Sequence, residues 1–309
     1  MKKFLLAFFA LIALKPLIAQ QLPHFSQYML NDYVENCAIA GKNPYVEASS
    51  INRYQWFGIT DAPRTYVLSV NGQLSNPNMG FGGQVFTDID GPTRRTGCYL
   101  SYAYHINLTK KIRLAAGIQG GLLQYMVDGS KIILHDPNDN VLSNGLQSVM
   151  MPEFGAGVYA YSGDKWYAGF SCPEMVENKL KFFDYMASTP SVITRHYTLM
   201  AGYKYDINDL WAIQPTLIAR YVDPSPVQFD LGARLIYRKK IWIGAAYRNL
   251  DAIVALIGYT YQDNITIGYA YDYAITDIQN YSTGSHELFV SMRFREAGHK
   301  AAPVAGGSN

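Results

Sequence analysis

After residue 19 the sequence contains no hydrophobic run long enough to cross a membrane as a helix. Every apolar stretch is short or is broken by Asp, Arg, Asn or Gly, whereas a spanning helix needs about 20 apolar residues. Cysteine is scarce: Cys37, Cys98 and Cys172 are too few and too scattered for a disulfide framework, although one bridge stays open. The net charge is only +2, without a concentrated basic patch, which argues against a nucleic-acid partner.

Motifs that carry catalysis are also absent. No G-x-S-x-G, H-E-x-x-H, Walker-type or C-x-x-C sequence occurs, and the 6 histidines never pair at metal-ligand spacing. Residues 80–83 superficially resemble a glycine-rich nucleotide loop, but they lie inside a predicted strand, where close packing explains them. Residues 135–140 offer oxygen ligands for calcium without the spacing of an EF-hand, which favours a solvated loop. The sequence predicts no catalytic, cofactor or metal site and no enzyme; a hydrolase using His105 or His196 stays open.

The N-terminus has the layout of a secretory signal peptide. Lys2 and Lys3 precede an apolar run over residues 4–14, and the small residue Ala19 follows. The run is too short to span a bilayer as a helix. We therefore expect a signal peptide over residues 1–19; the alternative is the buried first helix of a soluble protein.

Hydrophobic residues recur at every second position along the rest of the chain. In residues 264–273, Ile and Tyr side chains share one face, while Asn, Thr, Gly, Ala and Asp share the other, and residues 196–205 and 227–237 repeat this pattern. Such alternation is typical of a strand with one oily face. Most of these segments have about ten residues, as in transmembrane barrels, whereas strands of soluble proteins have about 5–6.

The pattern predicts an all-β fold, a transmembrane antiparallel up-and-down β-barrel of about 14 strands. One barrel domain is expected over residues 51–295. Its predicted strands are 51–59, 64–74, 79–88, 95–108, 111–126, 149–162, 165–172, 195–206, 211–221, 227–238, 241–249, 252–262, 264–274 and 286–295.

The connections between these strands separate by length. The longest, 127–148, 173–194 and 275–285, all fall at one end of the predicted barrel. Bacterial barrels have short periplasmic turns and longer extracellular loops. We therefore expect periplasmic turns at 75–78, 109–110, 163–164, 207–210, 239–240 and 263.

Two features refine this picture. Trp166 and Trp211 begin strands on the outward face, where an interfacial aromatic belt is expected. Pro215 lies within a strand and lacks a backbone donor, so we expect a bulge or a sheet edge there.

The lumen-facing positions carry charges of both signs, whereas an ion-selective pore more often has a ring of one sign. These positions include Arg113, Gln119, Lys204, Gln228, Asp230, Arg234, Arg248, Asp272, Glu287 and Arg293. The mixture indicates compensating ion pairs. Residues 20–50 are aromatic-rich and are expected to form a periplasmic N-terminal segment or a plug, and residues 296–309 a flexible periplasmic tail.

A family resemblance rests on the N-terminal third of the chain. The string P-H-F-S-Q-Y-M at 23–29 is followed by N-C-A-I-A-G at 36–41, R-Y-Q-W at 53–56, A-P-R-T at 62–65 and D-I-D-G-P at 88–92. This series resembles the PorP/SprF family of type IX secretion and gliding-motility proteins. Cys37 and Ile39 depart from the N-P-x-Y-A-G that the family usually has.

The resemblance implies a non-enzymatic protein of the cell outer membrane that serves the type IX export machinery. Implied partners are outer-membrane lipid, a periplasmic ring lipoprotein with its partner, an OmpA-like peptidoglycan-binding periplasmic protein, and a secreted surface-anchored substrate. We hypothesise that residues 23–41 and the periplasmic turns dock the machinery, the alternative being that this segment only plugs the barrel. The partner-binding residues predicted are His24, Phe25, Ser26, Gln27, Tyr28, Met29, Arg53, Gln55, Trp56 and Arg64.

Two other functions remain compatible with the sequence. A diffusion porin or a transporter of hydrophobic substrates would use the same barrel. A soluble periplasmic β-sandwich or adhesin would also show alternating strands.

Overall fold

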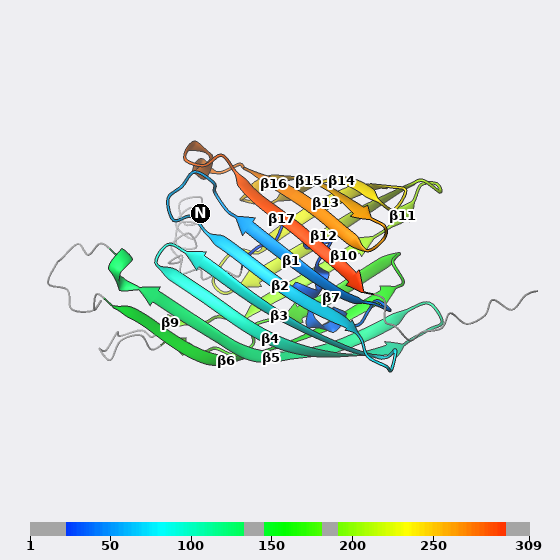
Figure 1. The fold of residues 1–309 in the computed structure, drawn as a ribbon, viewed down its shortest axis with the longest axis horizontal. Helices are drawn as coiled ribbons and strands as arrows, with labels where there is room; N and C mark the ends of the chain where they lie inside the picture. Colours follow the sequence, from blue (N-terminus) through cyan, green and yellow to red (C-terminus); the bar gives the residue numbers. More distant parts are fainter. Residues whose placement is uncertain (1–22, 133–144, 181–190, 295–309) are drawn as a thin grey trace, which may run out of the picture.

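The computed structural model describes residues 23–132, 145–180 and 191–294. The predicted signal peptide, the candidate calcium loop and the predicted C-terminal tail lie outside these residues. Within the described residues, antiparallel strands form a closed barrel of 14 strands (Figure 1). Strands that follow one another in the sequence are neighbours in the wall, and β1 pairs with β17 to complete the circle. The predicted all-β barrel is confirmed.

Most wall strands have the predicted bounds to within a few residues. In chain order they are β1 (Val46–Tyr54), β2 (Arg64–Gln73), β3 (Met79–Asp90), β4 (Thr93–Asn107), β5 (Arg113–Asp128), β6 (Leu146–Ser162), β7 (Trp166–Cys172), β10 (His196–Tyr203) continued by β11 (Tyr205–Asp206), β12 (Trp211–Val222), β13 (Gln228–Tyr237), β14 (Ile241–Arg248), β15 (Ala252–Tyr261), β16 (Ile265–Ala274) and β17 (Ser285–Phe294).

Short elements complete the described chain. A two-stranded sheet joins β8 (Lys179–Leu180) to β9 (Ser191–Val192), and the 3-10 helices are η1 (Asp32–Val34), η2 (Cys37–Ile39), η3 (Gly129–Lys131) and η4 (Asp277–Asn280). Among the described residues, no helix combines the length and the apolar character needed to cross a membrane.

The two faces of the wall differ as the alternation predicts. On the outer face Leu231 is 58% exposed and Ile267 is 50% exposed, whereas Thr266 and Asp272 on the inner face are buried. Trp211 is also exposed, next to a short turn. An oily exterior around a polar interior is the arrangement of a barrel that faces lipid.

The connections divide the barrel into two distinct ends. The short-turn end carries residues 74–78, 108–112, 163–165, 207–210, 238–240 and 262–264. The long-loop end carries the longest connections, which include residues 173–195 and 275–284. This division matches the predicted one.

Strand β1 is displaced from its predicted position. It spans Val46–Tyr54 instead of residues 51–59. Its outward residues Ser50 and Asn52 are polar, so the oily alternation that marked the other strands is missing here. The apolar residues that follow belong to a turn, in which Trp56 and Gly58 have φ of 48° and 105°.

The bulge or edge predicted at Pro215 is absent. β12 lies inside the wall, between β10–β11 and β13. Its pairing with β10 stops at Gly202–Thr216 and resumes with β11 at Tyr205–Ile213 in the same register. Because proline has no N–H to give, the ladder is interrupted locally while the strand stays straight through the wall.

Candidate functional site

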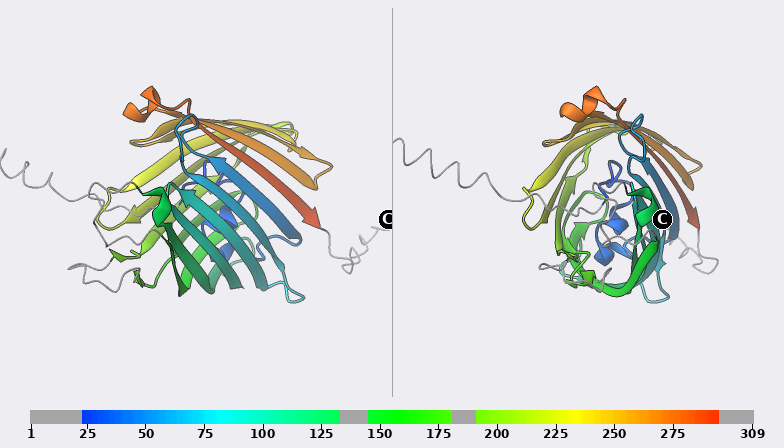
Figure 2. Two further views of the ribbon diagram at one scale, coloured as in Figure 1. Left: turned by 60° about the vertical axis from the view of Figure 1, so that its left-hand side comes forward. Right: turned by 90° about the vertical axis from the view of Figure 1, so that its left-hand side faces the viewer.

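Residues 23–42, called here the N-terminal segment, lie inside the barrel. Figure 2 shows this chain within the ring of strands when the barrel is viewed end-on. The hydroxyl of Tyr28 bonds Thr216 of β12 at 2.9 Å, and that of Tyr33 bonds Ser101 of β4 at 2.7 Å. Both tyrosines are buried and belong to the main hydrophobic core. The core of the molecule is therefore the contact between this segment and the inner wall.

The segment runs from the long-loop half of the lumen to the short-turn end. Ser26 meets residues at the long-loop ends of β16 and β17. At the other extreme the carbonyl of Ala40 lies 2.8 Å from His105 Nε2, close to the end of β4. The chain then reverses into β1 at the short-turn end.

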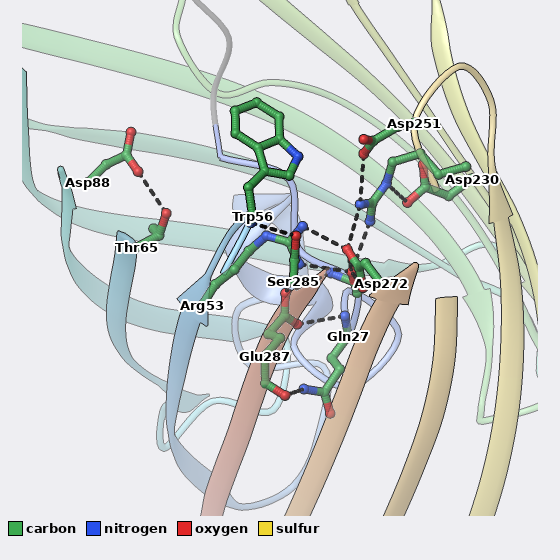
Figure 3. Close-up of polar contacts among 12 residues, drawn as sticks. Gln27, Arg53, Trp56, Thr65, Asp88, Asp230, Asp251, Asp272, Ser285 and Glu287 are labelled. Carbon is green, nitrogen blue, oxygen red and sulfur yellow. Dashed lines mark hydrogen bonds and ion pairs between the residues drawn. The ribbon is translucent and has the colours of Figure 1, made fainter. Parts of the chain in front are cut away.

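A buried cluster of charges holds the start of the segment, called here the charge cluster. Its two guanidinium groups pair with three carboxylates at 2.7 to 3.1 Å, and all five side chains are almost fully buried. Its members are Arg248 together with Arg53, Asp230, Asp272 and Glu287, the last four of which are labelled in Figure 3. The predicted compensating ion pairs are confirmed.

The N-terminal segment completes this cluster. The Ser26 hydroxyl donates to Asp272 at 2.7 Å and accepts from Arg53 and Arg248 at 3.1 and 3.0 Å. The backbone N–H groups of Ser26 and Gln27 donate to the Glu287 carboxylate at 2.9 and 2.8 Å. Hydrogen bonds to buried charges offset part of the cost of removing them from water. The segment is thus part of the polar network of the wall.

A second ion pair fixes the middle of the segment. Glu35 accepts from Arg220 of β12 at 2.6 Å, and both side chains are buried. Arg220 also lies 3.8 Å from Asp230, which connects this pair to the charge cluster. Neither residue of the pair was predicted as a site residue, although Arg220 has the lumen-facing parity of its strand.

Glycines of the wall let the segment approach closely. A Cβ atom on Gly80 would collide with the backbone of Ala40, and one on Gly117 with the backbone of Ala38. On Gly82 it would meet the ring of Tyr33. The close packing predicted for the glycine-rich stretch of β3 is confirmed.

Both ring nitrogens of His105 are engaged in hydrogen bonds that hold the structure together. Its Nε2 faces the Ala40 carbonyl, and its Nδ1 lies 2.9 Å from the Tyr161 hydroxyl. Because a carbonyl only accepts, Nε2 carries the proton, and Nδ1 accepts from the tyrosine. In the described part of the chain, no group of three or more His, Cys, Asp or Glu residues is arranged to hold a metal. The 3 cysteines are unpaired.

Two cavities flank the segment. A cavity of about 590 Å³ opens at the short-turn end, called here the short-turn vestibule; its lining includes Lys42, Tyr45, Glu47, Asp164, Lys204, Arg234, Lys239, Asp263 and Arg293. An inner cavity of about 70 Å³ lies in the long-loop half, between His24, Phe25 and the wall. Lys42 pairs with Asp32 at 2.9 Å on the floor of the vestibule.

The structure divides the predicted partner-binding residues into three groups. Ser26, Gln27 and Arg53 meet in the charge cluster. His24 and Phe25 line the inner cavity, and Tyr28 and Met29 lie in the core. The remaining residues, Gln55, Trp56 and Arg64, lie in or beside the β1–β2 connection at the long-loop end.

The sequence left two positions open for this segment, a periplasmic location or a plug inside the barrel. Its most specific string lies in the lumen, nearer to the long loops. The sequence pattern contained no signal for this path, because the partners of Ser26 lie 246 and 261 positions away.

Solved structures with a similar fold are outer-membrane barrels of low sequence identity. The toluene transporter TbuX of Ralstonia pickettii aligns with a TM-score of 0.48 and 12% identity, over 85% of this chain and 92% of that one. The Omp33 protein of Acinetobacter baumannii aligns with a TM-score of 0.46 and 11% identity, over 81% of this chain and 98% of that one. No curated protein sequence matches this chain significantly.

A family model identifies the chain more specifically. The model of the type IX secretion system membrane protein PorP/SprF matches residues 17–292. The match covers the N-terminal segment and nearly the whole barrel. This chain, an outer-membrane β-barrel, therefore belongs to the PorP/SprF family of type IX secretion system membrane proteins.

Proposed function

We propose that this barrel is a non-enzymatic membrane anchor that docks periplasmic components of the type IX machinery at its short-turn end. The observation that carries the proposal is the occupied lumen. The N-terminal segment is fixed there by Ser26 and Glu35, through two linked sets of buried ion pairs. A barrel built in this way offers the machinery a fixed surface.

The second candidate, a porin or a transporter of hydrophobic substrates, has less support. The inner cavity of about 70 Å³ is well below the roughly 300–1,000 Å³ of typical small-molecule sites. Its lining includes charged residues, Glu35 and Arg220, which are already paired with each other.

The docking surface that we propose is the rim of the short-turn vestibule. Short turns of bacterial barrels face the periplasm, where the ring lipoprotein with its partner and the OmpA-like protein are expected. Lys239 and Asp263 are exposed on this rim, beside aromatic side chains such as Tyr45. Charged rims steer association and set partner choice. A surface-anchored substrate is the partner expected if docking occurs at the long loops.

The proposal is tested by reversing charges at the two ends. Lys239→Glu combined with Asp263→Lys should abolish secretion and co-purification of the periplasmic ring from native membranes, while the level of heat-modifiable barrel stays normal. The matched control is Asp277→Lys, at an exposed position of the long-loop end. Loss of partners in the control but not in the vestibule variant would refute docking at this end.

A further inference from the structure

β6 extends beyond the end of its neighbour β7 on the long-loop side. β7 ends at Cys172, opposite Ala156, while residues 146–155 of β6 pair with no strand on that side in the part of the chain that the structure describes. The chain after β7 supplies isolated bonds instead: Met175 N donates to the Phe154 carbonyl at 2.9 Å. The gap between β6 and β10 is therefore lined by residues of a connection.

A hollow of about 570 Å³ lies on the outer face beside this gap, called here the outer hollow. Its lining consists of Ala156, Gly157, Val158, Phe170, Cys172, Met175, Arg195 and Tyr197. Val158, Phe170 and Met175 are each exposed by 43–47%. The volume lies within the range of about 300–1,000 Å³ of small-molecule sites, and such sites are mostly apolar.

Aromatic side chains indicate where this hollow lies across the thickness of the membrane. The ring of Tyr197 stacks with that of Phe170 at 6.3 Å and with that of Tyr221 at 6.4 Å, across β7, β10 and β12. Tyr197 and Tyr221 lie close to the long-loop ends of their strands. Tyrosine is enriched where lipid headgroups begin, so the hollow lies in the leaflet on the long-loop side.

Arg195 provides a positive charge at the edge of the hollow nearest to the long loops. Arg195 immediately precedes β10, and its side chain is 49% exposed. Its Nε donates to the Met175 carbonyl at 3.0 Å and lies 3.6 Å from the Glu177 carboxylate. Its two terminal nitrogens have no partner in the part of the chain that the structure describes. A guanidinium held through Nε alone retains the pair of donors that binds phosphate.

We propose that the outer hollow binds the phosphorylated glycolipid of the outer leaflet, with one acyl chain in the hollow and a phosphate on Arg195. Hydrocarbon is the material that fills an apolar hollow at bilayer depth, because an empty hollow forfeits the dispersion contacts of its lining. The long-loop end faces the cell exterior under the rule for bacterial barrels. The adjoining leaflet of an outer membrane carries this glycolipid.

The test measures lipid retained by the full-length barrel, purified from native membranes in mild detergent. Native mass spectrometry should detect the glycolipid on the wild type. Arg195→Gln should lower its retention by about tenfold, as expected for the loss of a hydrogen bond to a charged group. Ala156→Leu should also lower its retention, because the larger side chain occupies part of the hollow. The matched controls are Arg238→Gln at the short-turn end and Ala255→Leu on the outer face of β15, and neither should change retention.

A second measurement does not depend on native lipid. Purified glycolipid added to the delipidated barrel should raise the thermal midpoint of the wild type more than that of Arg195→Gln, because a ligand stabilises the state that binds it. Equal retention in all variants, a glycerophospholipid in place of the glycolipid, or glycolipid binding that appears only after residues 181–190 are deleted would overturn the proposal. Arg195 is exposed, so its variant remains informative should Ala156→Leu not assemble.

Discussion

Individual buried charges decide how firmly the N-terminal segment is attached. Arg53 pairs with Asp272 at 2.7 Å and with Glu287 at 3.1 Å, and it also donates to Ser26. Removing one partner of a buried ion pair leaves an uncompensated charge, which costs about 3–5 kcal/mol. An exposed arginine makes no comparable contribution.

Arg53→Met should therefore destabilise the folded barrel by about 3–5 kcal/mol, measured by urea unfolding in detergent. Arg64→Met is the control, since Arg64 is exposed at the same end of the barrel and should change stability by less than about 1 kcal/mol. Equal effects of the two substitutions would show that the charge cluster does not hold the fold together.

The sequence reveals the face on which a wall residue lies, but not the residue that it contacts. The inward positions of Asp272 and Glu287 follow from the two-residue period alone. Their joint contact with Ser26 does not, because alternation gives the face of a side chain and not its partner across the lumen. Glu35 was missed for the same reason: it lies in irregular chain, where no period assigns a face.

At the scale of elements, glycine residues of the wall strands allow the N-terminal segment to pack closely against the wall. The strands could be predicted closely, since the outward faces of most of them are mainly apolar. The path of the segment could not, because it depends on close approaches at Gly80 and Gly117 that no local pattern encodes. A side chain at either position would occupy the space of the segment's backbone.

Gly80→Val should consequently displace the segment, whereas Gly83→Val should not. A Cβ on Gly83 would lie 3.3 Å from the flexible end of Leu100 and in ordinary contact with the Tyr99 carbonyl at 3.6 Å, on the outer face. We expect the Gly80 variant alone to become sensitive to protease within residues 23–42, detected by mass spectrometry of limited digests. Resistance of both variants would contradict the tight contact between β3 and the segment.

At the scale of the whole molecule, orientation in the membrane connects the structure to its proposed role. The short-turn end faces the periplasm in the arrangement that we propose. In a Cys98→Ser background, which removes the one cysteine that is exposed, Gln279→Cys should react with an impermeant maleimide on whole cells. Lys239→Cys and Asp263→Cys should react only after the outer membrane is opened. The opposite labelling pattern would invert the orientation.

We infer that the N-terminal segment closes the barrel. The most direct measurement is single-channel conductance in planar bilayers of the wild type and of a variant lacking residues 23–42. The wild type should show almost no conductance, and the deletion variant should form a steady ion-conducting pore, provided that its barrel remains heat-modifiable. A wild type that conducts as an open pore, or an assembled deletion variant that stays closed, would contradict this inference.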